Sequence, residues 1–169
     1  MQPRSYRRCH LFLQCPPTVS SLTTTKWRGV CFNTMNLSLR RFQLSLLPES
    51  FAIVGLLPGA DLPEWALKGS FFSVTRTSDE LSIVVEESLI PEGVRFQGGW
   101  RIIKVHGPFV LSEVGVLASL AGPLAASRIS LFALSTFDTD YLLVASENLA
   151  AAISTLEKMG HTFQRSESQ

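Results

Sequence analysis

The sequence predicts an α+β fold in which antiparallel sheets carry helices on one face. Three observations lead to this prediction. Apolar residues make up 46% of the 169 residues and charged residues 17%, which is enough apolar surface for a buried core. Short β-rich runs alternate with two stretches whose apolar residues recur at helical spacing. The second half of the chain also repeats residues of the first half at an offset of sixty.

The second half is the easier half to assign. Its expected strands cover residues 100–105, 129–135, 141–145 and 161–165. A helix should begin after Ser112, a good N-cap, and Pro123 should kink or shorten its last turn because proline has no amide hydrogen. A second helix should begin at Ser146 and end before Gly160. The resulting order, βαββαβ, is that of a ferredoxin-like unit.

The first half keeps the strands and loses most of the helices. Its expected strands cover residues 41–47, 51–57, 71–77 and 81–86. Residues 63–68 can form only about one helical turn, and the prolines and glycines of 87–99 disfavour a full second helix. We therefore expect a degraded first unit over residues 38–99, followed by a complete second unit over 100–166.

An internal alignment supports two related units. Residues 41–103 match residues 101–163 without gaps in twelve of 63 pairs, where chance gives roughly four. Glycines, prolines and strand patterns keep their register in this comparison, so we interpret the chain as a tandem repeat of one supersecondary unit.

Residues 1–34 differ from the rest of the chain. They hold all three cysteines, at spacings that match no zinc motif, and they are rich in Arg, Ser and Thr without any acidic residue. This composition is typical of an organelle transit peptide. Translation starting at Met35 is the alternative we favour, and a functional basic tail is a third. On each of these readings residues 1–34 should be disordered or removed, and we exclude them from the fold.

Charge and motifs exclude several function classes. Residues 1–48 carry seven basic and no acidic residues, whereas residues 49–169 carry eight basic and fourteen acidic ones, so the body has a charge of 8 − 14 = −6. This is a poor surface for nucleic acid, and no apolar run is long enough to span a membrane. No nucleophile, zinc or nucleotide motif occurs. His106 and His161 are expected in structural roles, so we predict no enzyme activity, no metal and no cofactor.

One loop and one turn could form a binding site. Residues 107–115 lead into the first helix of the second unit, whose unpaired N-terminal amides suit a carboxylate. Glu113 and Asp140 would supply negative charge nearby. Together these groups match a zwitterionic amino acid, preferably one with a basic or polar side chain. The alternative is purely structural: Glu113 supports the helix end and Asp140 shapes the turn.

These stretches resemble a known family. The βαββαβ order, EVGVLASLAGPLA (113–125) and ISLFALSTFDTDYLLV (129–144) look like the ACT domain, the ligand-binding module of amino-acid-regulated enzymes. More closely, they resemble small stand-alone bacterial proteins made of tandem ACT units, and the CASTOR cytosolic arginine sensors of animals. The resemblance covers about residues 41–163.

The resemblance implies a ligand held between two ACT units. The matching residues in this chain are Glu113, Val114, Gly115, Ser130, Leu131, Thr136, Phe137 and Asp140. Because the chain has one copy of each stretch, the pocket would form between two chains of a homodimer. Leu131 stands where the sensors have valine, so specificity for arginine does not carry over.

The function expected from this resemblance is regulatory. We expect an amino-acid-binding protein without catalytic activity, in the cytoplasm, or in an organelle if residues 1–34 are a transit peptide. The alternative is an interaction or accessory protein that keeps the fold and binds no ligand. Binding of the twenty amino acids would distinguish these two functions.

Overall fold

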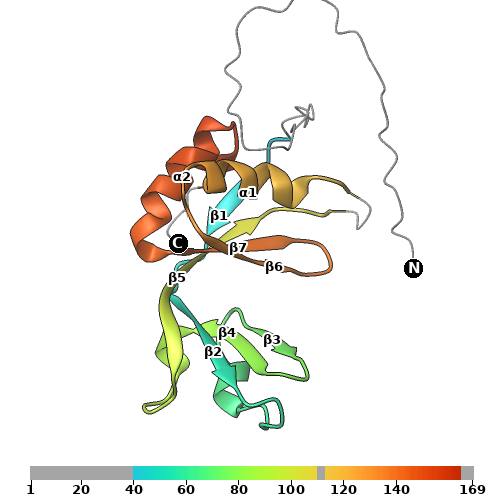
Figure 1. Cartoon of the computed structure of the whole chain (residues 1–169). Helices are drawn as coiled ribbons and strands as arrows, with labels where there is room; N and C mark the ends of the chain where they lie inside the picture. Colours follow the sequence, from blue (N-terminus) through green and yellow to red (C-terminus); the bar gives the residue numbers. More distant parts are fainter. Residues whose placement is uncertain (1–39, 110–112, 165–169) are drawn as a thin grey trace, which may run out of the picture. The chain divides into compact units, whose positions relative to one another are not determined.

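The computed structural model describes residues 40–109 and 113–164, which belong to one compact unit. These residues form one eight-stranded mixed sheet with helices, which confirms the predicted α+β fold (Figure 1). One parallel pair of strands departs from the antiparallel sheets expected. The expectations for residues 1–34 lie outside the described residues.

The first half of the described chain forms a small sheet with 3-10 turns in place of helices. Its strands are β2 (Phe51–Leu56), β3 (Ser73–Arg76) and β4 (Leu81–Glu86). The 3-10 helices are η1 (Glu64–Leu67) and η2 (Glu87–Leu89). Along the sheet the order is β3-β4-β2-β5, so β2 lies between β4 and β5.

The long strand β5 (Phe96–Val105) belongs to both halves of the sheet. Its beginning pairs with β2, and its end pairs with β7 from Trp100 onward. The sequence predicts this strand only from residue 100, and it uses Gly98 and Gly99 only as evidence against a helix. The structure places both glycines inside β5, where the register with β2 shifts and Gly99 has a φ of +75°. Such a bulge is where a strand accommodates glycine.

The second half forms a larger sheet covered by two helices. Its strands after β5 are β6 (Leu131–Ser135), β7 (Asp140–Ala145) and β8 (Thr162–Phe163). The helices are α1 (Val116–Ala126) and α2 (Leu149–Lys158), with the 3-10 turn η3 (Ser146–Asn148) before α2. The order β6-β7-β5-β1-β8 is that of a ferredoxin-like unit with one extra strand.

The extra strand is β1 (Gln43–Leu46). It pairs antiparallel with β5 and parallel with β8. The sequence predicts residues 41–47 as part of the first unit, whereas the structure inserts β1 between two strands of the second. An apolar strand pattern predicts burial but does not specify which sheet the strand joins, so the pattern alone could not locate β1.

The internal alignment pairs equivalent elements only in part. At the offset of sixty, β3 and β4 overlap β6 and β7. However, Val54 and Gly55 lie in β2, whereas their matches Val114 and Gly115 lie in the loop before α1. These two identities therefore do not join equivalent positions of the fold.

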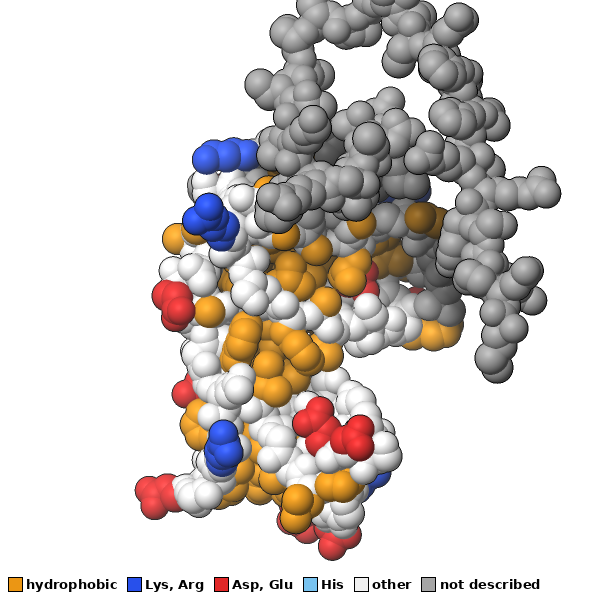
Figure 2. Space-filling model, in the orientation of Figure 1, with side chains coloured by type: hydrophobic (Ala, Val, Ile, Leu, Met, Phe, Trp, Pro, Cys, Tyr) orange, Lys and Arg blue, Asp and Glu red, His pale blue; other side chains and the backbone are white. Residues whose placement is uncertain are grey.

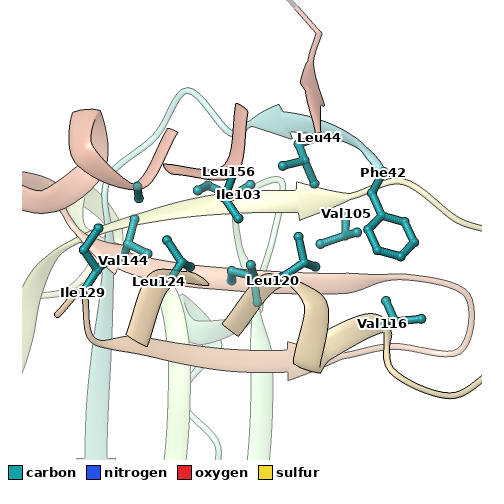
Figure 3. Packing of buried hydrophobic residues seen from close by; sticks show 12 residues of the cluster. Phe42, Leu44, Ile103, Val105, Val116, Leu120, Leu124, Ile129, Val144 and Leu156 are labelled. Carbon is teal, nitrogen blue, oxygen red and sulfur yellow. The ribbon is translucent and has the colours of Figure 1, made fainter. Parts of the chain in front are cut away.

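The main core lies between the two helices and the larger sheet. Leu120 and Leu124 of α1 point toward strand residues such as Ile103 and Val144, and Leu156 of α2 completes this layer (Figure 3). A second cluster lies under the 3-10 turns of the first half, around Ile83. A third cluster joins β2 and β4 to β5 and β7; its buried members are Phe51, Val84, Ile102 and Leu143. The two halves of the sheet are thus joined by a shared apolar layer as well as by β5.

Both helices begin later than the sequence predicts. The first begins at Val116 with Gly115 as N-cap, and the proposed cap Ser112 lies outside the described residues. The second begins at Leu149, because η3 occupies residues 146–148. The end of α2 agrees with the prediction: Gly160 has a φ of +90°, and the amides of Gly160 and His161 bond to the carbonyls of Glu157 and Leu156.

Candidate functional site

Two hollows lie on the described surface. The smaller, which we call the loop hollow, has a volume of about 310 Å³. The loop before α1, the first turn of α1 and the β6–β7 turn line it. Its lining residues are Phe109, Glu113, Gly115, Val116, Leu117, Ala118, Ser135, Thr136, Phe137, Asp138, Thr139 and Asp140.

The larger hollow, which we call the sheet hollow, has a volume of about 580 Å³. Residues in or next to β2, β4, β5 and β6 line it, among them Trp100, Ser130 and Leu131. Figure 2 shows hydrophobic side chains gathered between the β6–β7 hairpin and strands β2 and β4.

The residues expected in the site divide between these hollows. Five of them line the loop hollow: Glu113, Gly115, Thr136, Phe137 and Asp140. Ser130 and Leu131 line the sheet hollow instead. Val114 lines neither hollow and is 90% exposed.

The N-terminal end of α1 supplies hydrogen-bond donors to the loop hollow. Gly115, the N-cap, has a φ of +88° and provides no side-chain cap. The Gly115 carbonyl accepts the amide of Ser119, so the amides of Val116, Leu117 and Ala118 come before the first helical bond. These three residues line the hollow, and the helix dipole adds partial positive charge there. A left-handed φ favours glycine over a side chain at position 115.

The β6–β7 turn gives the hollow its acceptors. The Thr136 amide donates to the Thr139 carbonyl at 2.8 Å, and the Thr136 hydroxyl donates to the same carbonyl at 3.0 Å. The Asp140 carboxylate accepts the Ser135 hydroxyl at 2.5 Å, which holds it at the start of β7. This side of the hollow is therefore ordered and negatively charged.

A close approach ties the turn to the loop. The Phe109 amide donates to the Asp138 carbonyl at 3.1 Å. At Gly107 a β-carbon would lie 2.1 Å from that same carbonyl oxygen, so the backbones approach as closely as they do only because residue 107 is glycine.

Glu113 differs most from its expected role. It lies before the helix, not in the first turn, and its carboxylate forms an ion pair with the guanidinium of Arg40. The Glu113 side chain is 13% exposed and that of Arg40 is 53% exposed. Sequence reasoning missed Arg40, because its only signal is its position three residues before a strand that was assigned to the other unit.

His106 and His161 both have structural partners. His106 contacts the Ser45 hydroxyl at 2.9 Å. His161 is buried, stacks on Phe42 and accepts the Phe42 amide hydrogen on Nδ1 at 3.2 Å. Burial lowers the pKa of His161 below its ordinary value, and a hydrogen bond to the Ser119 backbone opposes this in part.

The bond to Ser119 has a cause in the sequence. Pro123 lies four residues after Ser119 and has no amide hydrogen, so the Ser119 carbonyl lacks its helical donor. The helix nevertheless continues to Ala126, so the expected shortening at Pro123 does not occur. The His161 ring is hydrogen-bonded at this gap in the helical ladder.

Within residues 40–109 and 113–164, no group of three His, Cys, Asp or Glu side chains is arranged to hold a metal ion. No helix of the described chain has the length and apolar character needed to cross a membrane.

Comparisons with known proteins agree with this fold. A family model of the ACT domain matches residues 95–158, and a second model, described only as an N-terminal domain, matches residues 49–93. A crystal structure of a protein from Agrobacterium tumefaciens is 39% identical, with a TM-score of 0.72, over 77% of this chain and 97% of that one. The chain belongs to the ACT-domain family. A Vibrio cholerae protein of unknown function has a similar fold: it is 19% identical, with a TM-score of 0.60, over 72% of this chain and 91% of that one.

The arginine sensors among the curated relatives are longer than this ACT-domain protein. The human cytosolic arginine sensor for mTORC1 subunit 1 is 38% identical over 60 residues, which is 35% of this chain and 18% of the sensor. The chain thus matches less than a fifth of the length of these relatives. A putative human protein, CASTOR3P, is 32% identical over 99 residues, which is 51% of this chain and 61% of that protein.

Proposed function

We propose that this ACT-domain protein is a regulatory module that binds a free amino acid in the loop hollow and has no chemistry of its own. The observation that carries the proposal is that hydrogen-bond donors and a carboxylate lie on opposite sides of one hollow. Uncapped helix amides lie on one side and the fixed Asp140 carboxylate lies on the other. A zwitterion needs both kinds of partner.

The proposed pose follows from these groups. The ligand carboxylate accepts hydrogen bonds from the amides of Val116, Leu117 and Ala118. Its ammonium donates to backbone carbonyls near Thr136 and Phe137, and Asp140 provides the compensating charge. Gly115 leaves the approach to the amides open, since it has no side chain.

A homodimer is part of the proposal. Ser130 and Leu131 line the sheet hollow of their own chain, so their contribution to a loop hollow requires a second chain. Among the described strands β6 pairs with β7 alone, which leaves its other edge open for a partner. Light scattering should give twice the chain mass of 18.6 kDa, and a species of 18.6 kDa at all concentrations would contradict the dimer. We propose a cytoplasmic location, in line with the name of the cytosolic sensors.

Calorimetry with the twenty amino acids tests the function. At least one should bind, and Asp140→Asn should weaken its binding by about 1–3 kcal/mol, the value of a charge-assisted hydrogen bond. Asp79→Asn is the matched control, because it removes the same charge from the β3–β4 turn, where the Asp79 amide donates to the Thr77 hydroxyl and which does not line the loop hollow. Equal affinity of the wild type and Asp140→Asn for the amino acid would contradict a binding site in the loop hollow.

A ligand-free interaction protein is the second candidate. Phe137 is 80% exposed and Val114 is 90% exposed, and both lie at the loop and turn that form the hollow. Exposed apolar side chains of this kind favour a protein contact. If none of the twenty amino acids binds, this candidate replaces the first.

A further inference from the structure

An arginine lies next to the loop hollow without lining it. Arg40 forms an ion pair with Glu113, which lines the hollow, and the Glu113 side chain is nearly buried. The position of Arg40 follows from the fold, because it lies three residues before β1, which is held by β5 on one edge and β8 on the other. The inserted strand therefore brings this arginine to the loop of the second unit.

We infer that Arg40 determines the ligand class of the loop hollow: by pairing with Glu113 it withholds this carboxylate from the ligand, so that the hollow selects an amino acid with an uncharged side chain. The inference rests on the proposed function. It changes the preference for a basic or polar side chain that the sequence suggests.

The charges around the hollow support this assignment. The carboxylates that line it are Glu113, Asp138 and Asp140, and none of its described lining residues is Lys or Arg. Asp140 is held by the Ser135 hydroxyl at 2.5 Å, on the side of the turn that faces the ammonium in the proposed pose. Glu113 comes from the opposite wall, the loop before α1, and its charge is balanced by Arg40.

A basic ligand would therefore compete with Arg40. Its side-chain cation would have to displace the guanidinium of Arg40 from a mostly buried carboxylate, or pair with Asp138, which is exposed to solvent. The first costs free energy, and an exposed ion pair contributes little. A neutral side chain of the same shape requires neither. The pair Arg40–Glu113 thus discriminates by charge and not by size.

L-Arginine and its neutral isostere L-citrulline are the probes for this inference. Calorimetry with the full chain should give the wild type a preference for citrulline. In Arg40→Gln the ratio of arginine to citrulline affinity should rise roughly ten- to a hundredfold, the range of one charge-assisted hydrogen bond. Arg41→Gln is the matched control, because it removes the same charge from the neighbouring residue and should leave the ratio unchanged. In a Glu113→Gln background, Arg40→Gln should also have no effect on the ratio.

The outcomes separate this inference from the function. An unchanged ratio in Arg40→Gln, or equal changes in Arg40→Gln and Arg41→Gln, overturns the role of Arg40 and leaves amino-acid binding intact. Binding of neither probe, nor of any of the twenty amino acids, to wild type and Arg40→Gln overturns the proposed function and this inference together. Circular dichroism and the unfolding midpoint of each variant confirm that the fold is retained.

Discussion

Truncating Leu44 to alanine should destabilise the larger sheet strongly. Leu44 is fully buried in the main core, although it lies in β1, the strand inserted between β5 and β8. Replacing a buried leucine by alanine removes its apolar contacts and leaves a cavity, at a cost of about 2–5 kcal/mol. Leu57→Ala is the control, because Leu57 is 80% exposed and should change stability by at most about 0.5 kcal/mol.

Urea unfolding measures the loss, and hydrogen exchange locates it. The amides of Thr162 and Gln164 donate to the carbonyls of Phe42 and Leu44, so their protection should fall with the weakening of β1. A loss below about 1 kcal/mol in Leu44→Ala, with unchanged protection at Thr162 and Gln164, would refute the insertion of β1 into this sheet.

Two other perturbations test features of the site's support. Burial lowers the pKa of His161, so the fold favours the neutral ring: its contribution is complete above the unfolded value of about 6.5 and is lost as pH falls through the lower folded pKa. Urea unfolding should therefore show that the free energy of unfolding falls between pH 7 and pH 5. His161→Gln should flatten this pH dependence more than His106→Gln does, since His106 is less buried. Equal slopes in the two variants would contradict the role of the buried His161 ring. Gly107→Ala should cost about 1–3 kcal/mol and weaken ligand binding, because the new β-carbon would clash with the Asp138 carbonyl, whereas Gly59→Ala meets nothing within 4 Å and should be neutral. Unchanged unfolding and calorimetry in Gly107→Ala would show that the loop and turn do not need this close approach.

Much of the fold could be predicted from local patterns. The alternation of apolar residues located β2, β4, β6 and β7, and the helical stripe ending at Gly160 located α2. Capping was less informative. The helix α1 begins after Gly115, which provides no side-chain cap, although Ser112 and Glu113 resemble a capped start. The Glu113 side chain pairs with Arg40.

The sheet partners could not be predicted in the same way. The sequence assigns no strand to residues 96–99, whereas the structure places them in β5 with a shifted register opposite β2. The residues of β1 have an apolar pattern that fits either sheet. Both outcomes depend on contacts distant in the sequence, which override local propensity.

The sequence predicted the loop and the turn of the candidate site, but not all the side chains that meet there. The loop and the turn meet as expected, and five of the eight named residues line one hollow. Arg40 lies 73 residues from Glu113 in the chain, so no local motif could reveal their pairing. Ser130 and Leu131 line the other hollow, and only a second chain could bring them to the first.

Backbone amide shifts during an amino-acid titration test the central claim most directly. In a ¹⁵N-labelled full chain, binding in the loop hollow should shift the amides of Val116, Leu117 and Ala118 downfield, together with those of the turn at Thr136 and Phe137. Amides beside the sheet hollow, such as those of Val54 and Phe96, should move little. A saturating titration with the best-binding amino acid that leaves residues 116–118 unshifted would contradict the account.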